Sequence, residues 1–79
     1  MDTLWLGYDS LTLPFHEIVA VLRYQPALNT RIAQAFGSVP GGIKAVVVTS
    51  DGAFLPTRWR ADQIRQRWAR WRTAPDEEL

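Results

Sequence analysis

The sequence predicts one small α+β domain, in which two helices pack on a mainly antiparallel sheet in the order ββ(β)-α-ββ-α. Two β-branched apolar runs, residues 17–22 and 43–49, are typical of strands. Asp51 and Gly52 lie between two apolar runs and indicate a hairpin. Residues 28–36 and 61–73 have the three- and four-residue spacing of helices.

The N-terminal part predicts short extended pieces. Residues 3–6 alternate polar and apolar side chains, and residues 7–10 (GYDS) have the composition of a turn. Residues 11–22 then carry two extended pieces, of which residues 17–22 are the stronger. Pro14 cannot donate to a sheet ladder, so we expect it at an edge or a bend between the pieces.

The first helix is predicted from Thr30, with Asn29 as its N-cap and Gly37 just beyond its end. Its apolar side chains share one face: Leu28, Ile32, Ala35 and Phe36. Residues 37–42 (GSVPGG) have no periodicity and predict a flexible loop. They lack the GK[ST] ending of a phosphate-binding loop and lead into a strand.

The second half predicts a hairpin followed by a helix. A strand at residues 43–49 meets a second strand at residues 53–55 through a type I′ turn, which needs positive φ at both central positions. Pro56 is expected to close the second strand, and Pro75 to end a helix over residues 61–73. We therefore expect one domain over residues 1–74 and a short acidic tail over residues 75–79, with Asp76, Glu77 and Glu78.

Composition limits the classes of function. The 79 residues contain no cysteine, which excludes disulfides and thiolate metal sites. A domain this small has a thin core, so we expect a homo-oligomer. Because no signal peptide and no apolar run of ~20 residues is visible, we expect a soluble cytoplasmic protein without a membrane partner.

The sequence has few catalytic features. His16 is the sole histidine, and its neighbour Glu17 would point to the opposite face of a strand. The other carboxylates lie in separate segments, without metal-ligand spacing. We therefore expect no enzyme, no metal, no cofactor and no small-molecule substrate.

Residues 58–72 (RWRADQIRQRWARWR) combine six arginines with three tryptophans and one acid, Asp62. Such a segment is typical of a nucleic-acid surface, of a helix on a membrane surface, or of a helix that docks by its tryptophans. At roughly 100° per residue, an apolar stripe spans about 80° of the helix. The stripe contains Ala61, Ile64, Trp68 and Trp71. We therefore assign Ile64, Trp68 and Trp71 to the core or to an oligomer interface.

The arginines lie outside this stripe. Arg65 and Arg72 border one side of it, Arg60 and Arg67 the other, and Arg70 the exposed face. Trp59 falls in the strand-to-helix connection and is the best candidate for an exposed aromatic anchor. One acid among six cations favours contact with a polyanion, whereas the narrow stripe argues against membrane adsorption. The candidate nucleic-acid-binding residues are Lys44, Arg58, Arg60, Arg65 and Arg67.

The order of motifs resembles a known family. LG at residues 6–7, IVAV at residues 18–21, a capped helix and KAVVVT at residues 44–49 resemble the RemA/RemB group of bacterial extracellular-matrix (biofilm) regulators. The RemB branch is the more similar, and the resemblance covers residues 4–70. It implies small α+β subunits that assemble into rings or arcs. In the RemA branch these subunits bind double-stranded DNA and regulate transcription of matrix genes.

The chain departs from this pattern at basic positions. Gly41 and Gly42 stand where RemA-type sequences carry an arginine pair, and Glu17 stands where a basic residue is frequent, whereas Lys44 is kept. DNA binding would therefore depend on the arginines from Arg58 onward. The alternative is an oligomeric assembly or adaptor module without nucleic-acid binding.

Overall fold

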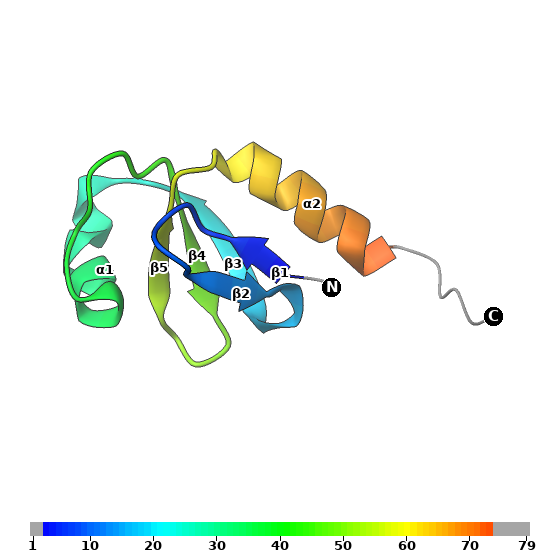
Figure 1. Cartoon of the computed structure of the whole chain (residues 1–79), viewed down its shortest axis with the longest axis horizontal. Coiled ribbons are helices and arrows are strands. Elements are labelled where there is room, and N and C mark those ends of the chain that lie inside the picture. Colours follow the sequence, from blue (N-terminus) through cyan, green and yellow to red (C-terminus); the bar gives the residue numbers. More distant parts are fainter. Residues whose placement is uncertain (1–2, 74–79) are drawn as a thin grey trace.

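The computed structural model describes residues 3–73 and has the predicted α+β class (Figure 1). Five strands and two α-helices are joined by two short 3-10 helices, η1 and η2. In chain order they are β1 (Thr3–Trp5), β2 (Thr12–Pro14), η1 (Phe15–Glu17), β3 (Ile18–Arg23), η2 (Pro26–Leu28), α1 (Asn29–Phe36), β4 (Ala45–Thr49), β5 (Phe54–Thr57) and α2 (Ala61–Thr73). The expected acidic tail, the stop at Pro75 and the domain boundary lie outside the described residues.

The strands form two antiparallel sheets instead of one. β1 and β2 pair as a hairpin, and β3, β4 and β5 form a three-stranded sheet in that order. The break falls where Pro14 ends β2 and the chain turns through η1, as expected of a residue that cannot donate to a ladder. The hairpin lies in front of the larger sheet in Figure 1, α1 lies beside β5, and α2 crosses above the hairpin.

One apolar core joins the two sheets to α2. Its buried members come from β1, β2, β3 and β4, from the turn after β1, from η1 and from the start of α2: Leu4, Leu6, Leu13, Phe15, Ile18, Val21, Ala45, Val47, Ala61 and Ile64. Trp59, Trp68 and Trp71 pack against this cluster while remaining partly exposed. Because Ala61 and Ile64 of α2 belong to this shared core, both sheets depend on α2 to bury their apolar side chains.

The helix α1 begins differently from the prediction. The chain already turns through η2, so Leu28 rather than Asn29 occupies the position before the helix, in a helical conformation. The Asn29 side chain instead accepts a 2.6 Å hydrogen bond from the Tyr24 hydroxyl, so the N-cap assignment is wrong. Gly37 adopts φ +97° and its N–H bonds to the Ala33 carbonyl, which confirms the predicted end.

Only part of the predicted apolar face of α1 is buried. Ile32 is fully buried, whereas Leu28 and Phe36 are half-buried and Ala35 is exposed. A single sheet edge cannot cover the whole stripe of a two-turn helix, because α1 packs mainly on β5.

The hairpin between β4 and β5 is confirmed, but its turn is of another type. Among residues 3–73, positive φ occurs at Gly52 and not at Asp51, so the connection is not type I′. The Gly52 N–H bonds to the Thr49 carbonyl and the Thr49 N–H to the Ala53 carbonyl, which gives a three-residue loop with one left-handed glycine. Pro56 lies inside β5, paired with Val46, because β5 is an edge strand that tolerates a missing donor.

The turn after β1 holds the chain close to the end of β5. Gly7 has φ +97°, and the Arg58 N–H donates to the Leu6 carbonyl at 3.0 Å. A Cβ atom added to Gly7 would lie 2.9 Å from the Arg58 Cβ. Glycine is therefore required at position 7 both for its backbone conformation and for this close approach.

The second helix has the predicted bounds, and its apolar stripe faces the core. Ile64 is 1% exposed, and Trp68 and Trp71 are half-buried. The Trp71 ring stacks on Phe15 with centroids 5.9 Å apart and planes 22° from parallel. The Arg72 guanidinium lies 5.2 Å from the centroid of the Trp68 ring. Packing is thus the role that this structure gives to both tryptophans.

Between residues 3 and 73, no helix combines the length and the apolar character that a membrane crossing requires.

Candidate nucleic-acid interface

Three chain segments meet at one end of the larger sheet. Antiparallel pairing sets Arg23, at the end of β3, opposite Ala45, at the start of β4. The Lys44 N–H donates to the Thr57 carbonyl at 2.9 Å, and the Lys44 carbonyl accepts from the Tyr24 N–H at 3.3 Å. The chain then leaves β5 and enters α2 within a few residues. Basic residues that are distant in sequence are therefore neighbours here.

These segments enclose a basic groove with a volume of about 470 Å³. Its lining contains four cations and a single carboxylate, with one aromatic ring: Arg23, Tyr24, Lys44, Arg60, Ala61, Asp62 and Arg65. All four cationic residues are exposed. We call this surface the basic groove. A groove lined mainly by one sign of charge attracts ligands of the opposite sign.

Arg65 is fixed in the groove by its backbone contact. Its Nη2 donates a 2.8 Å hydrogen bond to the Val21 carbonyl of β3, which is an edge strand of the three-stranded sheet. The guanidinium carries five N–H donors in a rigid fork, so one bond orients it while the others remain for a ligand. An oriented arginine loses less entropy when it binds a phosphate.

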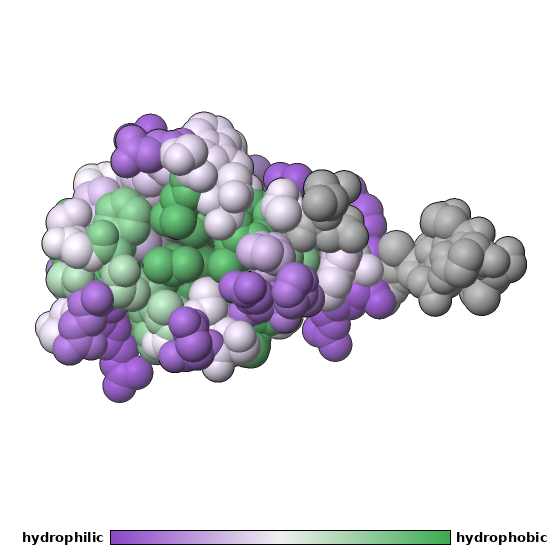
Figure 2. Space-filling view, turned by 60° about the horizontal axis from the view of Figure 1, so that its bottom comes forward, coloured by the Kyte–Doolittle hydropathy of each residue, from purple (hydrophilic) through white to green (hydrophobic). Residues whose placement is uncertain are grey.

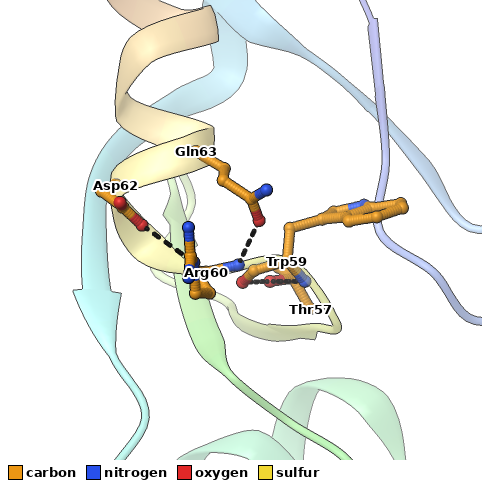
Figure 3. A network of polar contacts seen from close by, with 5 residues as sticks. All are labelled: Thr57, Trp59, Arg60, Asp62 and Gln63. Carbon is orange, nitrogen blue, oxygen red and sulfur yellow. Dashed lines mark hydrogen bonds and ion pairs between the residues drawn. The ribbon is translucent and has the colours of Figure 1, made fainter.

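The connection from β5 to α2 positions two further residues of the basic groove, Arg60 and Asp62 (Figure 3). The Thr57 hydroxyl donates to the Trp59 carbonyl at 2.9 Å and accepts from the Trp59 N–H at 3.3 Å. The Gln63 Oε1 then accepts from the Arg60 N–H at 3.1 Å, which satisfies a donor at the start of the helix. Asp62 lies 3.5 Å from the Arg60 Nε. That pair is mostly exposed and contributes at most ~1 kcal/mol to stability.

Three of the five predicted cations, Lys44, Arg60 and Arg65, lie together in the basic groove. Arg58 does not, since its guanidinium lies 5.1 Å from the centroid of the Tyr8 ring. Arg67 lies on the opposite flank of α2, beside Trp59 and Ile64. The prediction that Arg60 and Arg67 share a side is wrong, because Arg60 precedes the helix and does not follow its spacing.

Arg23 belongs to the groove but was absent from the predicted set. It ends the strand IVAVLR, and its place beside Lys44 follows from the antiparallel pairing of β3 with β4. The register between β3 and β4, had it been known, would have placed Arg23 beside Lys44. The spacing of residues along the sequence does not by itself predict that Arg23 lies near another cation.

The prediction that Trp59 is an exposed aromatic anchor is wrong, and Trp5, for which no role was predicted, is the more exposed ring. Trp59 is half-buried, and its Nε1 donates a 2.6 Å hydrogen bond to the Trp5 carbonyl, so it is not a free anchor. Trp5 is 49% exposed and packs edge-on against Trp59, with centroids 6.0 Å apart. The alternation over residues 3–6 indicates that Trp5 is exposed, because in a strand it places Trp5 on the face opposite to Leu4 and Leu6.

His16 and Glu17 lie in η1 and not in a strand, which places His16 Nε2 4.0 Å from a Glu17 carboxylate oxygen. Both side chains are exposed, and neither lines the basic groove. Gly41 and Gly42 also lie outside the groove, and the Gly41 carbonyl accepts from the Tyr8 hydroxyl at 3.1 Å. Neither residue pair therefore adds a side chain to the basic groove.

Comparisons of the chain with protein-family models, with curated proteins and with solved structures found no match. Within the part of the chain that the structure describes, no group of three or more His, Cys, Asp or Glu side chains is placed to hold a metal ion.

Proposed function

We propose that this chain is a cytoplasmic, homo-oligomeric DNA-binding regulatory protein, similar in role to the RemA/RemB regulators of matrix genes and without catalytic activity. The observation that supports the proposal is the meeting of Arg23, Lys44, Arg60 and Arg65 in one groove that holds a single carboxylate. Such a surface fits phosphates of a nucleic-acid backbone, whose contacts position a protein without reading sequence.

The basic groove predicts a strong dependence on salt. Each phosphate neutralised on duplex DNA adds about 0.9 to the slope of log affinity against log salt. Four groove cations give a slope of about 3.6 per subunit, so affinity should fall roughly 150-fold between 50 and 200 mM salt. Sequence preference per subunit should be slight.

Self-association is supported by the surface as well as by chain length. Figure 2 shows an apolar area in the middle of one face, bordered by hydrophilic residues. Val19 and Val39 are apolar residues with at least 40% of their surface exposed. Exposed apolar area of this kind is typical of a contact surface. An oligomer would repeat the basic groove and multiply its field.

The test is an anisotropy titration of a labelled duplex at 50 and 200 mM salt. Lys44→Glu with Arg60→Glu should abolish binding, because it reverses two groove charges. Arg31→Glu with Arg70→Glu is the matched control, since it makes the same charge change outside the groove. Absence of a complex at 50 mM salt with micromolar wild-type protein, or equal loss in both double variants, would refute the proposal.

The second candidate is an assembly or adaptor module without nucleic-acid binding. It is favoured by Val19, 54% exposed on the edge strand β3, and by the partly exposed Trp68 and Trp71. Under this hypothesis Trp68→Ala lowers the oligomeric mass or unfolds the domain. Light scattering decides the point, since a stable monomer for both wild type and variant contradicts it.

A further inference from the structure

The exposed indole of Trp5 is held in a fixed orientation beside α2. Its Nε1 donates a 2.9 Å hydrogen bond to the Asp9 carbonyl, and its ring meets Trp59 at 66°. Because about half of its surface stays in solvent, indole surface remains available for stacking. A rigid, exposed tryptophan loses little conformational freedom when a flat ligand stacks on it.

A small pocket adjoins this aromatic pair. It has a volume of about 180 Å³ and is lined by Leu4, Trp59, Gln63, Ile64 and Arg67. Leu4 and Ile64 are buried and form an apolar floor, whereas Gln63 and Arg67 are exposed and polar. The volume is below the ~300–1,000 Å³ of sites for drug-sized ligands. The pocket therefore suits one ring system with a polar or anionic attachment.

The pocket and the basic groove lie on the two flanks of the start of α2. Trp59 lines the pocket, while Arg60 and Ala61 line the groove. In Figure 3 the Trp59 ring extends away from Asp62, on the other side of the connection. Because two adjacent residues, Trp59 and Arg60, each line one of the two sites, a flexible strand that contacts the groove can also contact the pocket.

We propose that Trp5, Trp59 and Arg67 form a subsite for an unpaired nucleic-acid base, so that the chain binds single-stranded DNA more tightly than duplex. This inference rests on the proposed function. The base stacks on the Trp5 indole, and Arg67 contacts the neighbouring phosphate. In a duplex the bases are stacked within the helix and cannot reach the subsite without being unpaired.

The experiment compares a labelled 12-nucleotide oligo(dT) with a 12-base-pair duplex, by anisotropy at 50 mM salt. The wild type should bind the single strand more tightly. Trp5→Ala should weaken single-strand binding about 5- to 150-fold, the equivalent of the ~1–3 kcal/mol that a stacked base contributes. Its affinity for the duplex should change less than twofold.

Two further variants separate stacking from general effects. Trp5→Phe keeps an aromatic face and should retain most of the single-strand affinity, with reduced quenching of tryptophan emission by oligo(dT). Gln34→Ala truncates an exposed side chain outside both the subsite and the basic groove, and should leave both affinities unchanged. Circular dichroism confirms that each variant is folded, which is expected because Trp5 and Gln34 are exposed.

Each remaining outcome is decisive. If the duplex binds and the single strand binds no more tightly, or if Trp5→Ala leaves single-strand affinity within twofold, the subsite is refuted while the proposed function stands. If neither nucleic acid binds, both proposals fail. If Trp5→Ala changes the oligomeric mass and not the affinity, Trp5 belongs to a protein contact, and the subsite is again refuted.

Discussion

Replacement of Gly7 by alanine tests the contact that positions the β5–α2 connection. A Cβ atom at Gly7 would lie 2.9 Å from the Arg58 Cβ, 3.1 Å from its Cγ and 3.3 Å from its Cδ. Gly37 has the same φ of +97°, but a Cβ atom there would meet no atom of another segment within 4 Å. Gly7→Ala and Gly37→Ala therefore impose the same backbone strain and differ in one steric contact.

The difference in stability follows from these two terms. A left-handed conformation costs an alanine roughly 1–2 kcal/mol at either position. Crowding against Arg58 adds about 1–3 kcal/mol at Gly7 alone. Because 1 kcal/mol shifts the Tm of a domain this small by about 4–8 °C, Gly7→Ala should melt about 4–24 °C below Gly37→Ala.

Thermal unfolding followed by circular dichroism measures both variants under one buffer condition. Adding Arg58→Gly to Gly7→Ala removes the opposing atoms and should restore part of the lost stability, whereas adding it to Gly37→Ala should not. Equal melting temperatures for the two single variants, or a lower one for Gly37→Ala, would show that the Arg58 contact does not constrain this turn.

Three further results are expected. Asp62→Asn removes the sole groove carboxylate and should raise duplex affinity several-fold at 50 mM salt, whereas Asp9→Asn, the same change outside the groove, should not. The Thr49 hydroxyl donates to Asp51 and lowers the pKa of that carboxyl. The ionised Asp51 carboxylate therefore contributes to stability at pH values above 3.8, the ordinary pKa, and this contribution is lost as the pH falls through the lower pKa of the folded state. Asp51→Asn should remove the corresponding part of an acid-unfolding curve. Trp71→Ala should lower the free energy of unfolding by about 2–3 kcal/mol in a urea titration, because a half-buried aromatic ring is lost; no change would contradict its role in the core.

Local chemistry predicted the elements of the fold well. The bounds of α2 and the left-handed Gly37 depend on side-chain spacing and on backbone freedom within a few residues. The separation of the N-terminal hairpin from the larger sheet, and the helical conformation of Leu28, depend on neighbouring elements that local patterns do not describe. The turn type was wrong for a different, local reason: the Thr49 hydroxyl accepts from the Ala53 N–H and helps to close a three-residue loop that contains Gly52.

The candidate site was predicted in part. A helical wheel correctly placed Ile64 on the core side and Arg65 outside it. It failed for Arg60, which precedes the helix, and it had no means of finding Arg23, which comes from another strand. The groove forms where the end of β3 meets the start of β4, so its residues depend on the register in which these two strands pair. The pattern within one strand does not by itself determine that register.

The bonds that attach the N-terminal hairpin to the β5–α2 connection have a consequence for biosynthesis. The Trp59 Nε1 bond to the Trp5 carbonyl spans 54 residues, and the Arg58 bond to Leu6 lies beside it. At the ~5–20 residues per second of translation, Trp5 is made about 3–11 s before Trp59. During that interval β1 and β2 lack the partners that cover them. The nascent chain therefore exposes an unpaired apolar hairpin for seconds, and the tryptophan–arginine segment completes the domain when it is synthesised.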